Sequence, residues 1–263
     1  FDSGVGGLTV AREIMRQIPN ERIVYFGDTA RVPYGSKSKD NIIKFSRQII
    51  RFLQTENVKA IVIACNTASA LALDEMQQEF DLPILGVVKP GAKVAVETTA
   101  NKRIGLIGTE ANIRSGVYTR YIKSLDDEAK VFEKACPLFV PLVEEGWLHD
   151  DITLQVASRY LEELKEKDID TLIMGCTHYP LIRSTIRKVM GDKVNLVNPA
   201  YETAIELKNL LERDNLANKC DVDSPSSMYR FYVSDAEEKF KLFANSILPF
   251  DITMTKQINI ENY

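Results

Sequence analysis

Apolar residues along this chain fall into short buried runs that alternate with longer amphipathic segments. The runs at 23–27, 60–64 and 171–175 consist of apolar and small residues and predict buried strands. The segments between such runs repeat apolar residues every three or four positions, as 40–55 does, and predict helices. Alternating strands and helices are typical of mainly parallel sheets flanked by helices. We therefore expect an α/β fold.

Applied to the whole chain, this pattern gives eight strands and eight helices. The expected strands are 23–27, 60–64, 83–88, 103–108, 138–141, 171–175, 194–198 and 229–233. The expected helices are 8–18, 40–55, 68–80, 91–99, 112–124, 151–166, 201–213 and 235–247. Lys89-Pro90-Gly91 interrupts the pattern and indicates a crossing between domains, and the polar stretch 214–227 predicts a loop. The segment from Asp251 onward has no assigned structure.

Two stretches, 60–69 and 171–180, share one arrangement. Each is a strand that ends at a cysteine, Cys65 or Cys176, followed by small hydrogen-bonding residues and a helix. Ligands of open α/β sheets bind at the carboxyl ends of strands, where the next helix N-terminus lowers a thiol pKa. The match predicts two similar α/β domains, 1–90 with 205–263 and 91–204, with the active site at their interface.

Two opposed thiols can invert a carbon that bears an acidic hydrogen. One acts as a thiolate that removes the proton, while the other donates a proton from the opposite face. This chemistry needs neither a metal nor an organic cofactor. His178 could hydrogen-bond or charge-pair with Cys176, and Asp2 could either approach Cys65 or hold a substrate ammonium group. The polar groups of four further residues suit carboxylate oxygens: Ser3, Asn66, Thr67 and Thr177.

Composition excludes several other classes of protein. With 33 Lys and Arg, 37 Asp and Glu and a net charge of −4, the chain has no basic block for nucleic acid. It has no apolar run near the length of a membrane span, about 18 residues. The chain begins at Phe1 without an initiating Met or a signal-peptide pattern, and we expect a few residues of a first strand before it.

Cysteine and histidine usage narrows the chemistry. The four cysteines lack C-x-x-C spacing and do not form a disulfide framework, and the two histidines argue against a zinc site. A reducing cytoplasm fits these features. Cys136 and Cys220 lack the strand-end context and are interpreted as inert small hydrophobes. His149, in a charged stretch, is interpreted as solvated.

Four motifs together resemble the bacterial glutamate racemases of the aspartate/glutamate racemase superfamily. The resemblance covers about residues 1–200, with 138–146 between the third and fourth motif. The motifs are Phe1-Asp2-Ser3-Gly4-Val5-Gly6-Gly7, Gly27-Asp28-Thr29-Ala30-Arg31-Val32-Pro33-Tyr34-Gly35, Ala64-Cys65-Asn66-Thr67-Ala68 and Gly175-Cys176-Thr177-His178-Tyr179-Pro180.

The resemblance implies cofactor-independent interconversion of L- and D-glutamate, which supplies D-glutamate for peptidoglycan. It also implies that Cys65 acts on the D-enantiomer and Cys176 on the L-enantiomer, with Asp2 and His178 assisting. A family glutamate falls at Glu144 or Glu145, and we prefer Glu144. The implied substrate contacts are Asp2, Ser3, Tyr34, Gly35, Asn66, Thr67, Thr177 and His178. Members of the family are commonly homodimers, whereas residues from about 214 onward match poorly.

Three other functions remain open at this point. An aspartate racemase of the same superfamily is the nearest, although His178 after Cys-Thr favours glutamate because the relatives resemble Cys-Thr-Glu. A thiol hydrolase that uses Cys176 and His178 would pass through a covalent acyl intermediate and would not need Cys65. A non-catalytic amino-acid-binding module would bind glutamate without exchanging its α-hydrogen.

Overall fold

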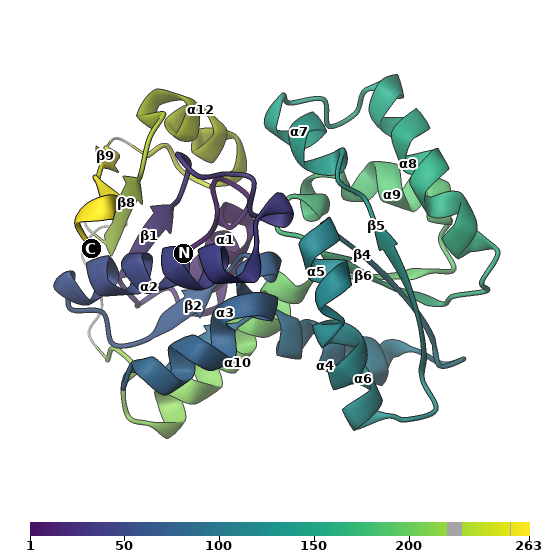
Figure 1. Ribbon diagram of the computed structural model, residues 1–263, viewed down its shortest axis with the longest axis horizontal. Coiled ribbons are helices and arrows are strands. Elements are labelled where there is room, and N and C mark those ends of the chain that lie inside the picture. The colour runs from purple at the N-terminus through teal and green to yellow at the C-terminus, as the bar shows by residue number, and fades with distance from the viewer. Residues whose placement is uncertain (220–227, 253) are drawn as a thin grey trace.

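The computed structural model describes residues 1–219, 228–252 and 254–263, which form two lobes (Figure 1). The first lobe is built on β1, β2, β3, β8 and β9, and the second on β4, β5, β6 and β7. Every strand pair in both lobes is parallel. Helices flank the sheets, so the expected α/β class is confirmed.

The strands form ladders of order β1-β8-β9 and β2-β3 in the first lobe and β5-β4-β6-β7 in the second. Their bounds are β1 (Ile23–Gly27), β2 (Ile61–Ile63), β3 (Ile84–Gly86), β4 (Arg103–Gly108), β5 (Lys130–Ala135), β6 (Thr171–Gly175), β7 (Asn195–Val197), β8 (Tyr229–Val233) and β9 (Lys256–Gln257). Of the predicted strands, all except 138–141 are confirmed, within a few residues at their ends.

The helices are α1 (Leu8–Gln17), α2 (Lys39–Thr55), α3 (Asn66–Glu79), α4 (Val88–Thr98), α5 (Glu110–Ser115), α6 (Val117–Leu125), α7 (Phe139–Glu144), α8 (Asp151–Lys165), α9 (Arg183–Met190), α10 (Pro199–Arg213) and α12 (Glu237–Ile247). Short 3₁₀ turns are η1 (Tyr34–Ser36), η2 (Tyr179–Ile182) and η3 (Ile260–Asn262). The amphipathic pattern that predicted α2 is typical: Ile42, Ile49 and Leu53 are buried along one face.

The two ladders of the first lobe are joined by Phe1 and Asp2. The Phe1 nitrogen donates to the Val62 carbonyl of β2, and the Ala64 N–H donates back to the Phe1 carbonyl. On the other side, the Asp2 N–H donates to the Phe26 carbonyl of β1. The first motif therefore lies at the centre of the lobe, between two strands whose carboxyl ends face the second lobe.

The predicted strand at 138–141 is wrong, because these residues begin α7. Phe139, Val140 and Val143 are buried at helical spacing. Pro141 lies in the first turn, where a backbone N–H would have no acceptor within the helix, so its absence costs no hydrogen bond. The strand lies earlier, at β5, an edge strand whose charged residues and partial exposure hide it from a search for buried runs.

Two other boundaries differ from the prediction. The expected helix 112–124 is divided into α5 and α6 at Gly116, whose φ of 61° is left-handed and ends the first helix. The expected break at Lys89-Pro90-Gly91 is instead the first turn of α4, which begins at Val88. Proline there removes no helical hydrogen bond.

The predicted limits between the domains stay a prediction. The limit at 90–91 falls within α4 and the limit at 204–205 within α10, which packs on both α1 and α4. Most of the expected loop at 214–227, including Cys220, lies outside the described residues. The segment that had no assigned structure contains β9 and η3, and both pack on the first lobe.

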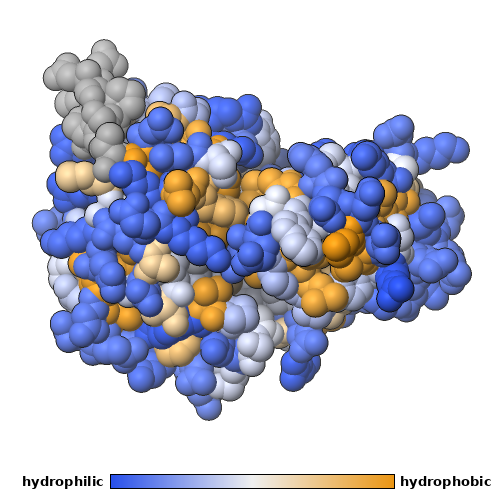
Figure 2. All heavy atoms as spheres, turned by 90° about the horizontal axis from the view of Figure 1, so that it is seen from above, coloured by the Kyte–Doolittle hydropathy of each residue, from blue (hydrophilic) through white to orange (hydrophobic). Residues whose placement is uncertain are grey.

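The face of the molecule seen from above is mostly hydrophilic. Figure 2 shows charged and polar side chains over most of one face, with apolar side chains in small groups among them. Within the described ranges, no helix is both long enough and apolar enough to cross a bilayer.

Candidate active site

The two strand-end cysteines line one pocket between the lobes. Cys65 is the N-cap residue of α3, just after β2, and its carbonyl accepts from the Ser69 N–H at 2.8 Å. Cys176 directly follows β6, the strand whose buried run predicted it. Both side chains are buried, at 5% and 7% exposure. Two segments 111 positions apart in the sequence therefore face the same small space.

Both lobes contribute residues to the pocket wall. The pocket is narrow, with a cavity volume of about 20 Å³. Its lining includes Ser3, Tyr34, Gly35, Cys65, Asn66, Thr67, Cys176, Thr177 and His178, which the sequence predicted. It also includes Val32, Pro33, Thr109 and Val140, which were not predicted as site residues. Asp2 and Glu144 lie behind the wall, in contact with residues that form it.

On the Cys176 side, a buried histidine connects the thiol to a carboxylate. His178 Nδ1 lies 3.8 Å from Cys176 Sγ, and its Nε2 lies 3.1 Å from Glu144 Oε1. Burial alone would lower the pKa of His178, but its contacts with Cys176 and Glu144 outweigh burial and raise that pKa to about 10. The ring is therefore an imidazolium at neutral pH and donates to both partners.

The geometry distinguishes Glu144 from its neighbour. Glu144, at the end of α7, reaches His178, and this contact holds the pKa of its carboxyl below the ordinary value although burial acts in the opposite direction. Glu145 is exposed and lies 3.7 Å from Lys239 Nζ at the surface. The contact with His178 thus belongs to the residue that the sequence favoured.

On the Cys65 side, the surroundings are anionic or neutral. Burial and the negative charge of Asp2 raise the pKa of Cys65 to about 12, and contacts with the Ala68 N–H and the Ser3 hydroxyl oppose this rise. The thiol form of Cys65 therefore predominates at neutral pH in the free site.

Asp2 connects the glycine-rich turn of the first lobe to the second lobe. It is fully buried, and its Oδ2 accepts from the Gly4 N–H at 3.0 Å. Its Oδ1 accepts from the Thr177 hydroxyl at 3.2 Å. Gly6 allows this approach, since a Cβ there would lie 2.4 Å from Thr177 Oγ1 and 2.5 Å from His178 Nδ1.

Further hydrogen bonds tie the pocket walls together across the lobes. The Tyr118 hydroxyl donates to Asn66 Oδ1 at 2.7 Å, and the hydroxyls of Thr67 and Thr109 lie 2.8 Å apart. Within the second lobe, Asn112 donates to the Gly175 carbonyl at 2.8 Å and so fixes the end of β6 beside Cys176. Thr109 could have been found from the sequence, because it follows β4 as Cys65 follows β2.

The described part of the chain has no group of three or more His, Cys, Asp or Glu residues that could hold a metal ion. The ionisable auxiliaries at the pocket are His178 and Glu144 on the Cys176 side and Asp2 on the Cys65 side. The arrangement can remove a proton on one side of a bound molecule and return one on the other.

Comparison with known proteins gives a consistent relationship over the whole chain. Residues 7–205 match the family described as Asp/Glu/Hydantoin racemase. The glutamate racemase of Geobacter metallireducens is 43% identical over 261 residues, which cover 99% of this chain and 96% of that protein.

Solved structures agree with the sequence comparison. The glutamate racemase isoform RacE1 from Bacillus anthracis superimposes with a TM-score of 0.93 at 38% identity and covers 98% of this chain and 95% of that one. The glutamate racemase of Francisella tularensis, solved in complex with D-glutamate, gives a TM-score of 0.92 at 38% identity, with 100% and 97% coverage. On this evidence, the chain belongs to the Asp/Glu/Hydantoin racemase family, among its glutamate racemases.

Proposed function

We propose that this protein is an isomerase that interconverts L- and D-glutamate by proton transfer between two thiols. The observation that carries the proposal is that Cys65 and Cys176, from different lobes, line one pocket. The identity of about 43% to glutamate racemases along the full chain supports glutamate as the substrate. The product D-glutamate would serve peptidoglycan synthesis.

In the proposed reaction, each thiol serves one enantiomer. Cys65 removes the α-hydrogen of D-glutamate while Cys176 donates a proton to the opposite face, and the roles exchange for L-glutamate. A thiolate formed at Cys65 is a strong base because its pKa is high. On the other side, the His178 imidazolium stabilises the Cys176 thiolate, and Glu144 holds the ring in place.

The polar groups of the wall would bind the substrate. Hydroxyl and N–H groups at Ser3, Asn66, Thr67 and Thr177 suit the carboxylates and the enolate-like charge that develops at the α-carboxylate. Tyr34 and Gly35 close another side of the pocket. Because the walls come from both lobes, glutamate can enter when the lobes move apart. We also propose a homodimer, which light scattering in solution would test.

Incubation with each enantiomer of glutamate in D₂O, followed by NMR, tests the proposal. The wild-type protein should exchange the α-hydrogen of both enantiomers and racemise them. Cys65→Ala should still exchange L-glutamate slowly but not invert it, because Cys176 can remove and return the proton on one face. Cys176→Ala should do the same with D-glutamate only. Cys136→Ala, which changes a buried cysteine outside the pocket lining, is the matched control.

Other outcomes identify the alternatives. Turnover of D-aspartate but not D-glutamate would move the substrate assignment to the aspartate branch. A fully active Cys65→Ala variant would favour a thiol hydrolase, and binding of glutamate without any exchange would indicate a binding module. Each of these results would overturn the two-thiol proposal for glutamate.

A further inference from the structure

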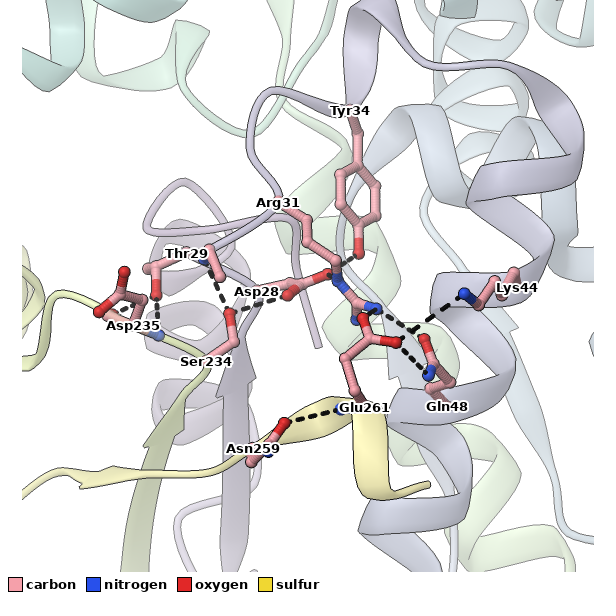
Figure 3. Close-up of polar contacts among 11 residues, drawn as sticks. Asp28, Thr29, Arg31, Tyr34, Lys44, Gln48, Ser234, Asp235, Asn259 and Glu261 are labelled. Atoms are coloured by element: carbon pink, nitrogen blue, oxygen red, sulfur yellow. Dashed lines mark hydrogen bonds and ion pairs between the residues drawn. The ribbon is translucent and has the colours of Figure 1, made fainter.

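A fully buried carboxylate, Asp28, lies directly behind one wall of the pocket. Asp28 follows β1, and its side chain is 0% exposed. Its Oδ2 accepts a hydrogen bond from the hydroxyl of Tyr34, a residue of the pocket lining (Figure 3). Val32, Pro33 and Gly35, which line the pocket beside Tyr34, belong to the same loop. The carboxylate is therefore one hydrogen bond away from the substrate space.

Both oxygens of Asp28 are held from other directions as well. Arg31 Nε donates to Oδ2 at 2.7 Å, and the Ser234 hydroxyl, just after β8, donates to Oδ1 at 2.8 Å. Burying a carboxylate is costly unless it is paired and hydrogen-bonded, and Asp28 is both. Since donors reach it on both sides, its orientation is fixed, and so is the point to which the Tyr34 hydroxyl is anchored.

Arg31 extends this network to α2 and to the C-terminal turn. Its Nη1 donates to Gln48 Oε1 at 2.6 Å and to Glu261 Oε1 at 3.1 Å. The guanidinium also lies over the ring of Phe45, 4.1 Å from its centre. Gln48 Nε2 in turn donates to Glu261 Oε2 at 3.2 Å. Figure 3 shows Gln48 of α2 and Glu261 of η3 pointing toward Arg31 in the loop after β1.

We propose that Asp28 is a positioning residue for glutamate binding, which fixes the pocket wall 32–35 through Tyr34 while Arg31 and Ser234 hold its carboxylate. The inference rests on the proposed function for its kinetic test. Asp28 does not touch the pocket itself, so it acts on the substrate only through the residues of the wall. The C-terminal turn contributes through Glu261, which braces Arg31.

Kinetics of Asp28→Asn, Tyr34→Phe and the double variant test this role. An amide has one acceptor where the carboxylate has two, so Asp28→Asn leaves a donor from Arg31, Ser234 or Tyr34 unmatched. We expect KM for glutamate to rise about tenfold in Asp28→Asn and about threefold in Tyr34→Phe, with smaller changes in kcat. If Asp28 acts on the pocket through Tyr34, the double variant should be no worse than Asp28→Asn.

A control variant removes a more exposed ion pair elsewhere in the first lobe. Glu56 pairs with Arg230 at 2.7 Å and accepts from the Tyr232 hydroxyl at 3.0 Å, away from the pocket wall. Glu56→Gln should leave KM unchanged. Arg31→Lys, which keeps the charge but loses the planar fork, should give an intermediate KM if Asp28 acts through its orientation.

A second readout does not depend on turnover. If the wall 32–35 is displaced, iodoacetamide should alkylate Cys65 about fivefold faster in Asp28→Asn than in the wild type or Glu56→Gln, measured by peptide mass spectrometry. Unchanged KM and unchanged alkylation in Asp28→Asn, even with a lowered Tm, would overturn the inference. A wild-type protein that does not racemise glutamate would overturn the proposed function instead, while the alkylation comparison would still decide the role of Asp28.

Discussion

The two sides of the pocket share a backbone arrangement but differ in charge. Cys65 and Cys176 both follow a buried strand, and both are buried among small polar residues. Beside Cys176 lies the His178 imidazolium, backed by Glu144. On the Cys65 side, the carboxylate of Asp2 opposes thiolate formation. The strand, cysteine and helix that the two segments share thus position each thiol in the same way. The auxiliary side chains, which are His178 and Glu144 on one side and Asp2 on the other, give each thiol a different electrostatic environment.

The two thiols therefore have unlike surroundings. The His178 imidazolium lies beside Cys176, while the Cys65 side favours the neutral thiol at neutral pH. An ammonium group of a bound amino acid near Asp2 would offset that carboxylate and bring the two sides closer together. Substitutions of the auxiliary residues test this difference between the two sides.

The largest effect is expected from His178→Asn. Loss of the imidazolium removes the cation beside Cys176, and kcat should fall about 100-fold. Since the two enantiomers have equal free energy in water, kcat/KM must fall equally in both directions, although the two kcat values can change unequally. Initial rates from each enantiomer, followed by circular dichroism, measure this. His149→Asn at an exposed site is the control, and equal activity in both variants would contradict the role of His178.

An intermediate effect is expected from Glu144→Gln, with kcat lowered about tenfold because the His178 ring loses its charged partner. Stability should also change with pH. The raised pKa of His178 gives a stabilisation that is complete below its ordinary value of 6.5 and is lost as pH rises through about 10. The lowered pKa of Glu144 gives a second stabilisation, which is present above the ordinary carboxyl pKa of 4.5 and is lost as pH falls below 4.5.

Denaturant unfolding at several pH values checks this linkage. The wild type should exceed Glu144→Gln in unfolding free energy most clearly near pH 7, with the difference shrinking toward pH 10 and toward acid. Glu145→Gln, one residue away and at the surface, should show little difference at any pH. A constant difference across the whole range would mean that the contact with His178 does not stabilise the charged forms.

The smallest effect is expected from Ser3→Ala. Its hydroxyl lowers the pKa of Cys65, so its removal raises that pKa further and shifts the acidic limb of the kcat/KM profile to higher pH. At neutral pH we expect about a threefold loss of kcat/KM. A pH profile against the exposed Ser124→Ala variant measures the shift. If the acidic limb of the kcat/KM profile lies at the same pH in Ser3→Ala and Ser124→Ala, ionisation of Cys65 does not determine that limb.

Much of the site could be predicted because strand ends are local features. The runs before Cys65 and Cys176 mark both strands and both thiols, and the α/β alternation follows from periodicity alone. Val140 was missed because it lies on α7, which the sequence suggested to be a strand. The role of Asp28 was hidden for another reason, since its partner Ser234 and the brace at Glu261 are more than 200 positions away.

Burial of both sulfurs affects how fast oxidants can react with the two cysteine thiols. Peroxides attack the thiolate rather than the thiol, and they must first reach it. With a pKa near 12, Cys65 offers almost no thiolate to a peroxide at neutral pH, and the narrow pocket limits access to both sulfurs. The free pocket thereby protects Cys65 from oxidation by its thiol form and both sulfurs by their burial.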